Sequence, residues 1–169
     1  KFQPKIYKIG SDDLTNIPLI KYIAQKKKKI ILSTGMSNLI DIKKAVKAIE
    51  EEGNKKIDIL HCVSDYPTEI KNINLNVIKT LKKNFNYKIG LSDHTNNDLT
   101  SILATTMGAE IIEKHIIPSY ELKNWPDAEA SLDVNDFGKM IFKLRNIKKA
   151  YGSSQRKVFN CEKKWKIKA

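Results

Sequence analysis

Gly90-Leu91-Ser92-Asp93-His94-Thr95 is the stretch of sequence that decides the fold class. It closes an apolar run at residues 87–91, and a helical pattern follows at residues 99–107 and ends before Gly108. An apolar strand with a polar carboxyl end, followed closely by a helix, is typical of one βα unit in a parallel sheet. The run lacks clean alternation, as expected of a strand that is covered on both faces.

Four further segments repeat this pattern along the chain. Strands are predicted at residues 5–9, 29–33, 57–61 and 110–114. Apolar residues at helical spacing predict helices at residues 39–52, 73–81 and 134–151. About five βα units of this kind give an α/β fold, which is either a doubly wound open sheet or part of a (β/α)8 TIM barrel.

The composition limits the classes of protein that fit. The chain has 169 residues, of which 41% are hydrophobic and 30% charged, and its formal net charge is +12. That length suits one domain, and no apolar run approaches the ~20 residues of a membrane span. Only two of the 31 basic residues are Arg, on which nucleic-acid interfaces usually depend. We therefore expect a cytoplasmic protein with Cys62 and Cys161 as free thiols, and with neither membrane nor nucleic acid as a partner.

Polar side chains collect at the carboxyl ends of the predicted strands, which converge on one face of a barrel and carry the chemistry of barrel enzymes. They include Lys8, Ser11, Ser33, His61, Ser64, Tyr66, Ser92, His94, Glu113 and His115. All three histidines of the chain are among them. Their placement at successive strand ends favours a functional site over three separate structural roles.

Two kinds of chemistry follow from these residue types. His94 and His115 lie one βα unit apart, so adjacent strands would let their imidazoles share a divalent metal, although a core or rim histidine is the alternative. Lys8 offers a cation beside several serine hydroxyls, a set that suits a phosphate or carboxylate, although turn and N-cap roles are the alternative for each serine. The candidate acid, base or hydroxyl-binding carboxylates are Asp13, Asp93, Glu113 and Asp127.

Several blocks in order resemble the sialic acid synthase family, over residues 5–152. They include YKIGS at 7–11, DLTN at 13–16, ILSTGM at 31–36, LHCVS at 60–64, GLSDHT at 90–95 and IEKH at 112–115. The resemblance implies a TIM-barrel transferase that condenses phosphoenolpyruvate with an N-acetylated amino sugar. The product would be a nine-carbon ulosonic acid, and phosphate would be released.

The resemblance also implies roles for single residues. His94 and His115 match the pair that binds a divalent cation, usually Mn²⁺, with Mg²⁺ or Co²⁺ as alternatives. The positions that match substrate-binding residues are Lys8, Ser11, Ser64 and Ser92 for the phosphate, and Asp127 for the sugar hydroxyls. The positions that match residues near the reacting centre or in the pocket are Asp13, Ser33 and Tyr66.

The resemblance covers only part of the family pattern. Residues 1–152 match the last five strands of an eight-stranded barrel, and residues 153–169 form a basic tail at the start of a linker toward a C-terminal domain. We therefore expect a fragment of a homodimeric synthase that does not turn over alone. The alternatives are a catalytically incomplete fragment with a metal and phosphate half-site, a related aldolase for phosphorylated sugars, and, on net charge alone, a basic nucleic-acid-binding protein.

Overall fold

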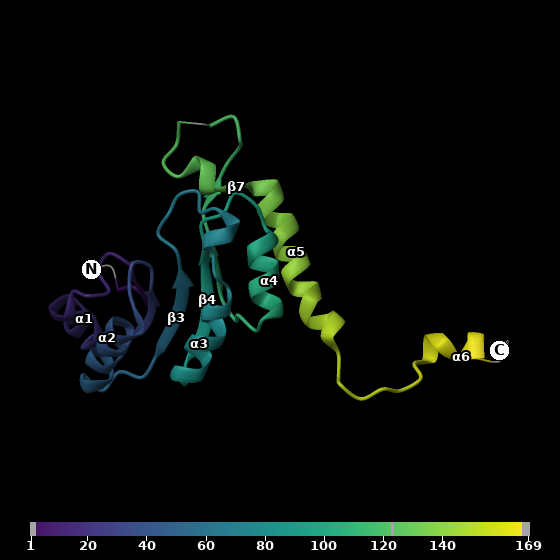
Figure 1. The fold of residues 1–169 in the computed structure, drawn as a ribbon, viewed down its shortest axis with the longest axis horizontal. Helices are drawn as coiled ribbons and strands as arrows, with labels where there is room; N and C mark the ends of the chain where they lie inside the picture. The colour runs from purple at the N-terminus through teal and green to yellow at the C-terminus, as the bar shows by residue number, and fades with distance from the viewer. Residues whose placement is uncertain (1–2, 123, 167–169) are drawn as a thin grey trace.

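A computed structural model describes residues 3–122 and 124–166, and its centre is a five-stranded parallel sheet (Figure 1). The strands are β1 (Ile6–Ile9), β2 (Lys29–Ser33), β3 (Ile57–Cys62), β4 (Lys88–Asp93) and β5 (Ile112–Lys114). They pair in the order β1-β2-β3-β4-β5, and every pair is parallel. A doubly wound sheet reverses its strand order at a switch point, whereas a barrel adds strands in sequence. The partial barrel is therefore confirmed, and the open doubly wound sheet is wrong.

Helices alternate with the strands. They are α1 (Ile17–Ala24), α2 (Leu39–Glu51), α3 (Asn76–Asn84), α4 (Leu99–Thr106) and α5 (Val134–Tyr151). The helical pattern had missed α1, because its eight residues are apolar on nearly every side. A local signal was present, since the Asn16 side chain accepts a hydrogen bond from the Leu19 amide at the helix start.

The two faces of the sheet differ. On the outer face, Ile30, Ile59 and Ile89 are fully buried in a core that they share with residues of the helices, such as Ile49 and Ile78. On the inner face of β1, Ile6 is 49% exposed and Lys8 is also exposed. The expectation that both faces are covered therefore holds for β3, which is buried throughout, but it is wrong for β1.

The segment after β5 forms a second, two-stranded sheet. Short strands β6 (Ile116–Ile117) and β7 (Leu132–Asp133) pair in parallel, and the loop between them contains the 3-10 turn η2 (Ala128–Ala130). After α5 the chain runs away from the sheet to α6 (Asn160–Lys166), as Figure 1 shows. Among the described helices, none is both long and apolar enough to cross a membrane.

Gly90 offers a direct test of the packing between β4 and its neighbours. A Cβ atom on this residue would lie 2.4 Å from the Ile111 carbonyl oxygen and 2.6 Å from Leu60 Cδ2. We expect Gly90→Ala to lower the free energy of unfolding by about 1–3 kcal/mol, the usual cost of overpacking. Gly138→Ala, in α5 where no atom outside the local helix backbone lies within 4 Å of the added Cβ, should raise it by up to about 1 kcal/mol. Urea unfolding measures both, and equal effects would contradict the inner-face packing.

Candidate functional site

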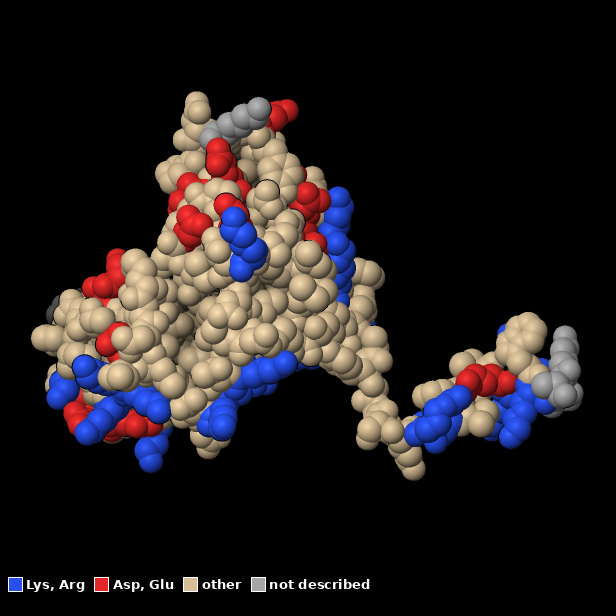
Figure 2. All heavy atoms as spheres, viewed as in Figure 1, with Lys and Arg blue, Asp and Glu red and all other residues tan. Residues whose placement is uncertain are grey.

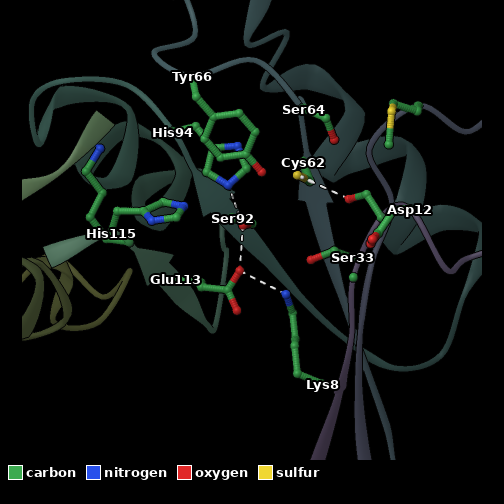
Figure 3. Close-up of a pocket in the computed structure, with 14 residues that line it drawn as sticks. Lys8, Asp12, Ser33, Cys62, Ser64, Tyr66, Ser92, His94, Glu113 and His115 are labelled. Atoms are coloured by element: carbon green, nitrogen blue, oxygen red, sulfur yellow. Dashed lines mark hydrogen bonds and ion pairs between the residues drawn. The ribbon is translucent and has the colours of Figure 1, made fainter. Parts of the chain in front are cut away.

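A cavity of about 720 Å³ opens at the carboxyl ends of the five strands, on the inner side of the sheet (Figure 3). The residues predicted from the sequence that line it are Lys8, Ser11, Ser33, Ser64, Tyr66, Ser92, His94, Glu113 and His115. They come from all five βα units. The register explains this convergence, because Cys62 pairs with Ser92 and Ser92 pairs with Glu113, so that strand ends of the same height face one space.

A continuous polar network crosses the cavity from β1 to β5. Lys8 Nζ donates to Glu113 Oε1 at 3.0 Å, and Ser92 Oγ donates to the same oxygen at 2.6 Å. His94 Nε2 lies 3.3 Å from Ser92 Oγ, and because Ser92 gives its single hydroxyl hydrogen to Glu113, this is a polar contact at the end of the network rather than a further hydrogen bond. Glu113 was only one of four candidate carboxylates in the sequence, yet it holds the centre of the network. The sequence signal for its placement is its position within β5, two residues before His115, which follows that strand.

The two histidines lie close together. The ring centroids of His94 and His115 are 5.3 Å apart, and Tyr66 stacks on His94 at 4.1 Å and meets His115 edge-on at 5.6 Å. His94 Nδ1 lies 2.8 Å from the Val63 carbonyl oxygen, which can only accept, so Nδ1 carries the proton and Nε2 keeps its lone pair. Burial lowers the pKa of His94, although the bond to Val63 opposes this shift. A neutral imidazole with a fixed tautomer is the form that binds metals.

The third histidine is not part of this group. We predicted that His61 would share the face of the other strand-end residues, and the structure corrects this. His61 points to the helix side of β3, where its ring Nε2 donates to the Ile73 carbonyl oxygen at 2.6 Å. Burial also lowers the pKa of this imidazole. His61 therefore serves packing around the turn before α3.

The loops after β1 and β2 bring further hydroxyls to the cavity. Ser11 Oγ accepts a hydrogen bond from the Gly35 amide at 2.9 Å. A Cβ at Gly35 would lie 2.2 Å from Ser64 Oγ and 2.8 Å from Ser11 Oγ, so a larger residue there would displace both hydroxyls. Ser33 Oγ is buried and has no hydrogen-bond partner among the described residues. A buried hydroxyl without a partner is costly, so this position fits a ligand that supplies one.

Three predicted carboxylates lie outside the cavity lining. Asp13 Oδ1 accepts from the Asn16 side chain at 3.5 Å, and Asp12 lines the cavity instead. Asp127 Oδ2 lies 3.9 Å from His115 Nδ1, in the loop before β7. Asp93 points away from the cavity toward α4, which makes its candidate role as an acid or base in the cavity wrong.

The cavity offers few side chains that could ligate a divalent metal. In the described part of the chain, no three His, Cys, Asp or Glu side chains gather closely enough to hold one together. The His94 and His115 imidazoles fit two positions, because both line the cavity and one has a fixed tautomer. Water or substrate oxygens would take the others, as in catalytic sites that keep positions open.

Comparison with known proteins identifies the class to which this barrel belongs. The model of the NeuB family matches residues 1–156, and the chain belongs to that family. It is 39% identical over 162 residues to N,N'-diacetyllegionaminic acid synthase of Campylobacter jejuni, and 35% identical over 155 residues to pseudaminic acid synthase of the same species. These matches cover 95% and 92% of this chain. The resemblance to sialic-type acid synthases is thus confirmed.

A solved structure agrees. The N-acetylneuraminic acid synthetase of Leptospira borgpetersenii matches with a TM-score of 0.86 and 33% identity, over 97% of this chain and 56% of that one. The chain spans 48% and 45% of the two Campylobacter synthases, about half the length of these relatives.

Proposed function

We propose that this chain supplies the metal and phosphate side of an active site that condenses phosphoenolpyruvate with an N-acetylated amino sugar. The reaction forms a nine-carbon ulosonic acid and releases phosphate. The observation that carries the proposal is the network of Lys8, Glu113, Ser92 and His94, which runs beside a second histidine within one cavity. The names of the relatives support the class of reaction.

The cation end of the network suits the phosphate of phosphoenolpyruvate. Lys8 supplies a positive charge, and hydroxyls of Ser11, Ser64 and Ser92 lie around the same space. Charge-assisted hydrogen bonds of this kind are about twice as strong as neutral ones. Lys8 and Ser92 both donate hydrogen bonds to Glu113. The ammonium and the hydroxyl are therefore already oriented toward the cavity before a phosphate binds to them.

Glu113 is placed to handle protons at the phosphate-bearing carbon. Attack of carbon 3 of phosphoenolpyruvate on the sugar aldehyde leaves an oxocarbenium carbon, to which water adds. The Glu113 carboxylate contacts both proposed phosphate ligands, so it lies within reach of that water and accepts its proton. The tetrahedral carbon then becomes the ketone of the product as phosphate leaves with the proton of the new hydroxyl. The proton taken up by Glu113 passes, through water in the open cavity, to the alkoxide formed from the aldehyde.

The histidine end suits the aldehyde. His94 and His115 would hold Mn²⁺, with Mg²⁺ or Co²⁺ as alternatives, and the bound cation supplies Lewis-acid polarisation of the aldehyde oxygen. Tyr66 covers both imidazoles, and Asp127 lies beside His115, where a sugar hydroxyl would meet it. Ser33 offers its unpartnered hydroxyl to a substrate oxygen. Asp13 stays a proposal from the family resemblance.

A chimera tests the proposal, because the chain spans about half of its relatives. Residues of the Campylobacter jejuni N,N'-diacetyllegionaminic acid synthase that match this chain are replaced by this chain, and phosphate release from phosphoenolpyruvate is measured with Mn²⁺ and candidate N-acetylated amino sugars. We expect turnover that depends on both substrates. The 169-residue chain alone should give none. A folded chimera without any turnover, or turnover without the sugar, would contradict the proposed function.

The alternatives differ in what supports them. A half-site without turnover fits the coverage of the relatives, and the unfused chain in the same assay tests it. A nucleic-acid interface has less support, since Figure 2 shows basic side chains spread over the region of α1 to α3, α5 and the tail, with acidic ones among them and around the loop before β7. The free thiols of Cys62 and Cys161 fit a reducing cytoplasm, and the homodimer and the fragment remain predictions.

A further inference from the structure

A buried ion pair joins the last residues of β4 and β5, and of the two only Lys114 is among the residues that line the cavity. Asp93 and Lys114 are register partners, and both side chains are fully buried. Lys114 Nζ lies 3.4 Å from Asp93 Oδ1. Burial alone would raise the pKa of Asp93, but Lys114 and hydrogen bonds outweigh it and lower that pKa.

Both oxygens of the Asp93 carboxylate are fully used. Oδ2 accepts from Thr100 Oγ1 and from Ser101 Oγ, each at 2.6 Å, in the first turn of α4. Oδ1 accepts from the amide and hydroxyl of Thr95, at 2.9 and 2.8 Å. Lys114 Nζ also donates to the Thr95 carbonyl oxygen. The network therefore ties together the end of β4, the turn after it, the start of α4 and the end of β5.

The two proposed metal ligands are neighbours of this network in the sequence. His94 lies between Asp93 and Thr95, and both of these neighbours are held in place. His115 directly follows Lys114. His94 and His115 are the first residues after β4 and β5, and both line the cavity. The ion pair thus fixes the two backbone points from which the imidazoles project.

Stability alone does not explain such a pair. Replacing a buried ion pair with apolar residues of similar volume is often neutral or stabilising. We propose that Asp93 and Lys114 are positioning residues, which hold the His94 and His115 imidazoles at the separation that a shared divalent cation needs. This inference rests on the proposed metal site. It assigns the separation of the two imidazoles to the buried ion pair formed by the residues that precede them.

The test measures Mn²⁺ binding to the 169-residue chain, with free Mn²⁺ followed by electron paramagnetic resonance. We expect Asp93→Asn to weaken Mn²⁺ binding by about 10- to 100-fold, the range seen when outer partners of metal ligands are lost. The visible absorption spectrum of bound Co²⁺ at saturation should change as well. A double variant, Asp93→Asn with Lys114→Met, leaves no buried charge unpaired and should fold while still binding weakly.

Asp58 supplies the matched control. It is a buried carboxylate at the opposite end of the sheet, where Lys29 Nζ lies 2.5 Å from its Oδ2. Asp58→Asn should lower the melting temperature without changing the Mn²⁺ affinity or the Co²⁺ spectrum. The inference is overturned if Asp93→Asn, or the double variant where the single one does not fold, binds Mn²⁺ as tightly as the wild type with an unchanged spectrum.

Failure of the metal site itself gives a different result. Wild-type chain that does not bind Mn²⁺, or that binds it equally well without His94 and His115, overturns the proposed site and this inference together. Normal binding through the two histidines, combined with unaltered binding by the Asp93 variants, overturns the positioning role alone.

Discussion

Replacing His94 and His115 together with Ala abolishes the Mn²⁺ binding that we expect of the wild-type chain. The two imidazoles form a close pair in the cavity, with ring centroids 5.3 Å apart, and the described residues offer no group of three metal-binding side chains. Loss of an outer partner already costs about 10- to 100-fold in metal affinity, so loss of both ligands should cost more than about 100-fold. Either single variant should remove most of the affinity, because one remaining imidazole is a poor chelator. Titration calorimetry measures each dissociation constant.

His61 is the control for this experiment. It is a buried histidine of the same sheet, but its ring is bound to the Ile73 carbonyl oxygen outside the cavity. His61→Gln keeps a side-chain donor and should bind Mn²⁺ like the wild type. Unchanged binding by the double alanine variant would contradict the ligand assignment.

Lys8→Met should raise the Michaelis constant for phosphoenolpyruvate in the chimera by about 10- to 100-fold, which corresponds to one charge-assisted hydrogen bond. Lys8 Nζ is the cation of the polar network, and its side chain is 38% exposed, so a phosphate reaches it from the open cavity. Loss of the cation also leaves Glu113 as an unbalanced negative charge beside the phosphate. Steady-state phosphate release at varied phosphoenolpyruvate gives the value.

Lys88 provides the matched variant for the lysine test. It begins β4 at the far end of the sheet, with Nζ 3.9 Å from a Glu110 carboxylate oxygen. Lys88→Met removes the same charge from the chain but none from the cavity, so its Michaelis constant should stay at the unsubstituted value. Equal increases for both variants would mean that net charge, rather than a local contact, attracts the substrate.

The sequence was most informative where a residue's strand position determines its surroundings. Strand ends in successive βα units predicted the convergence of Lys8, Ser92, His94 and His115, because the carboxyl ends of parallel strands share one edge. The same reasoning failed for His61, since position at a strand end does not say to which side the chain turns. One residue of offset decides that side.

Contacts across the cavity were beyond sequence reasoning. Nothing in the local sequence marks Glu113 as the partner of both Lys8 and Ser92. Those contacts depend on how all five strands are aligned, since β1 and β5 lie at opposite ends of the sheet. Asp93 illustrates the reverse case. It lies in the most informative motif, yet its bonds to α4 remove it from the cavity.

The short length of β5 has a consequence for how the site behaves over time. This strand has three residues and is the last of the five-stranded sheet, yet it carries Glu113 and leads into His115. Strands at the end of a sheet open locally at lower free energy than central ones. A ligand that binds only the closed form suppresses such opening by mass action. We therefore expect occupancy of the cavity by the proposed substrate to be coupled to closure of this end of the sheet, so that the ligand helps to order its own site.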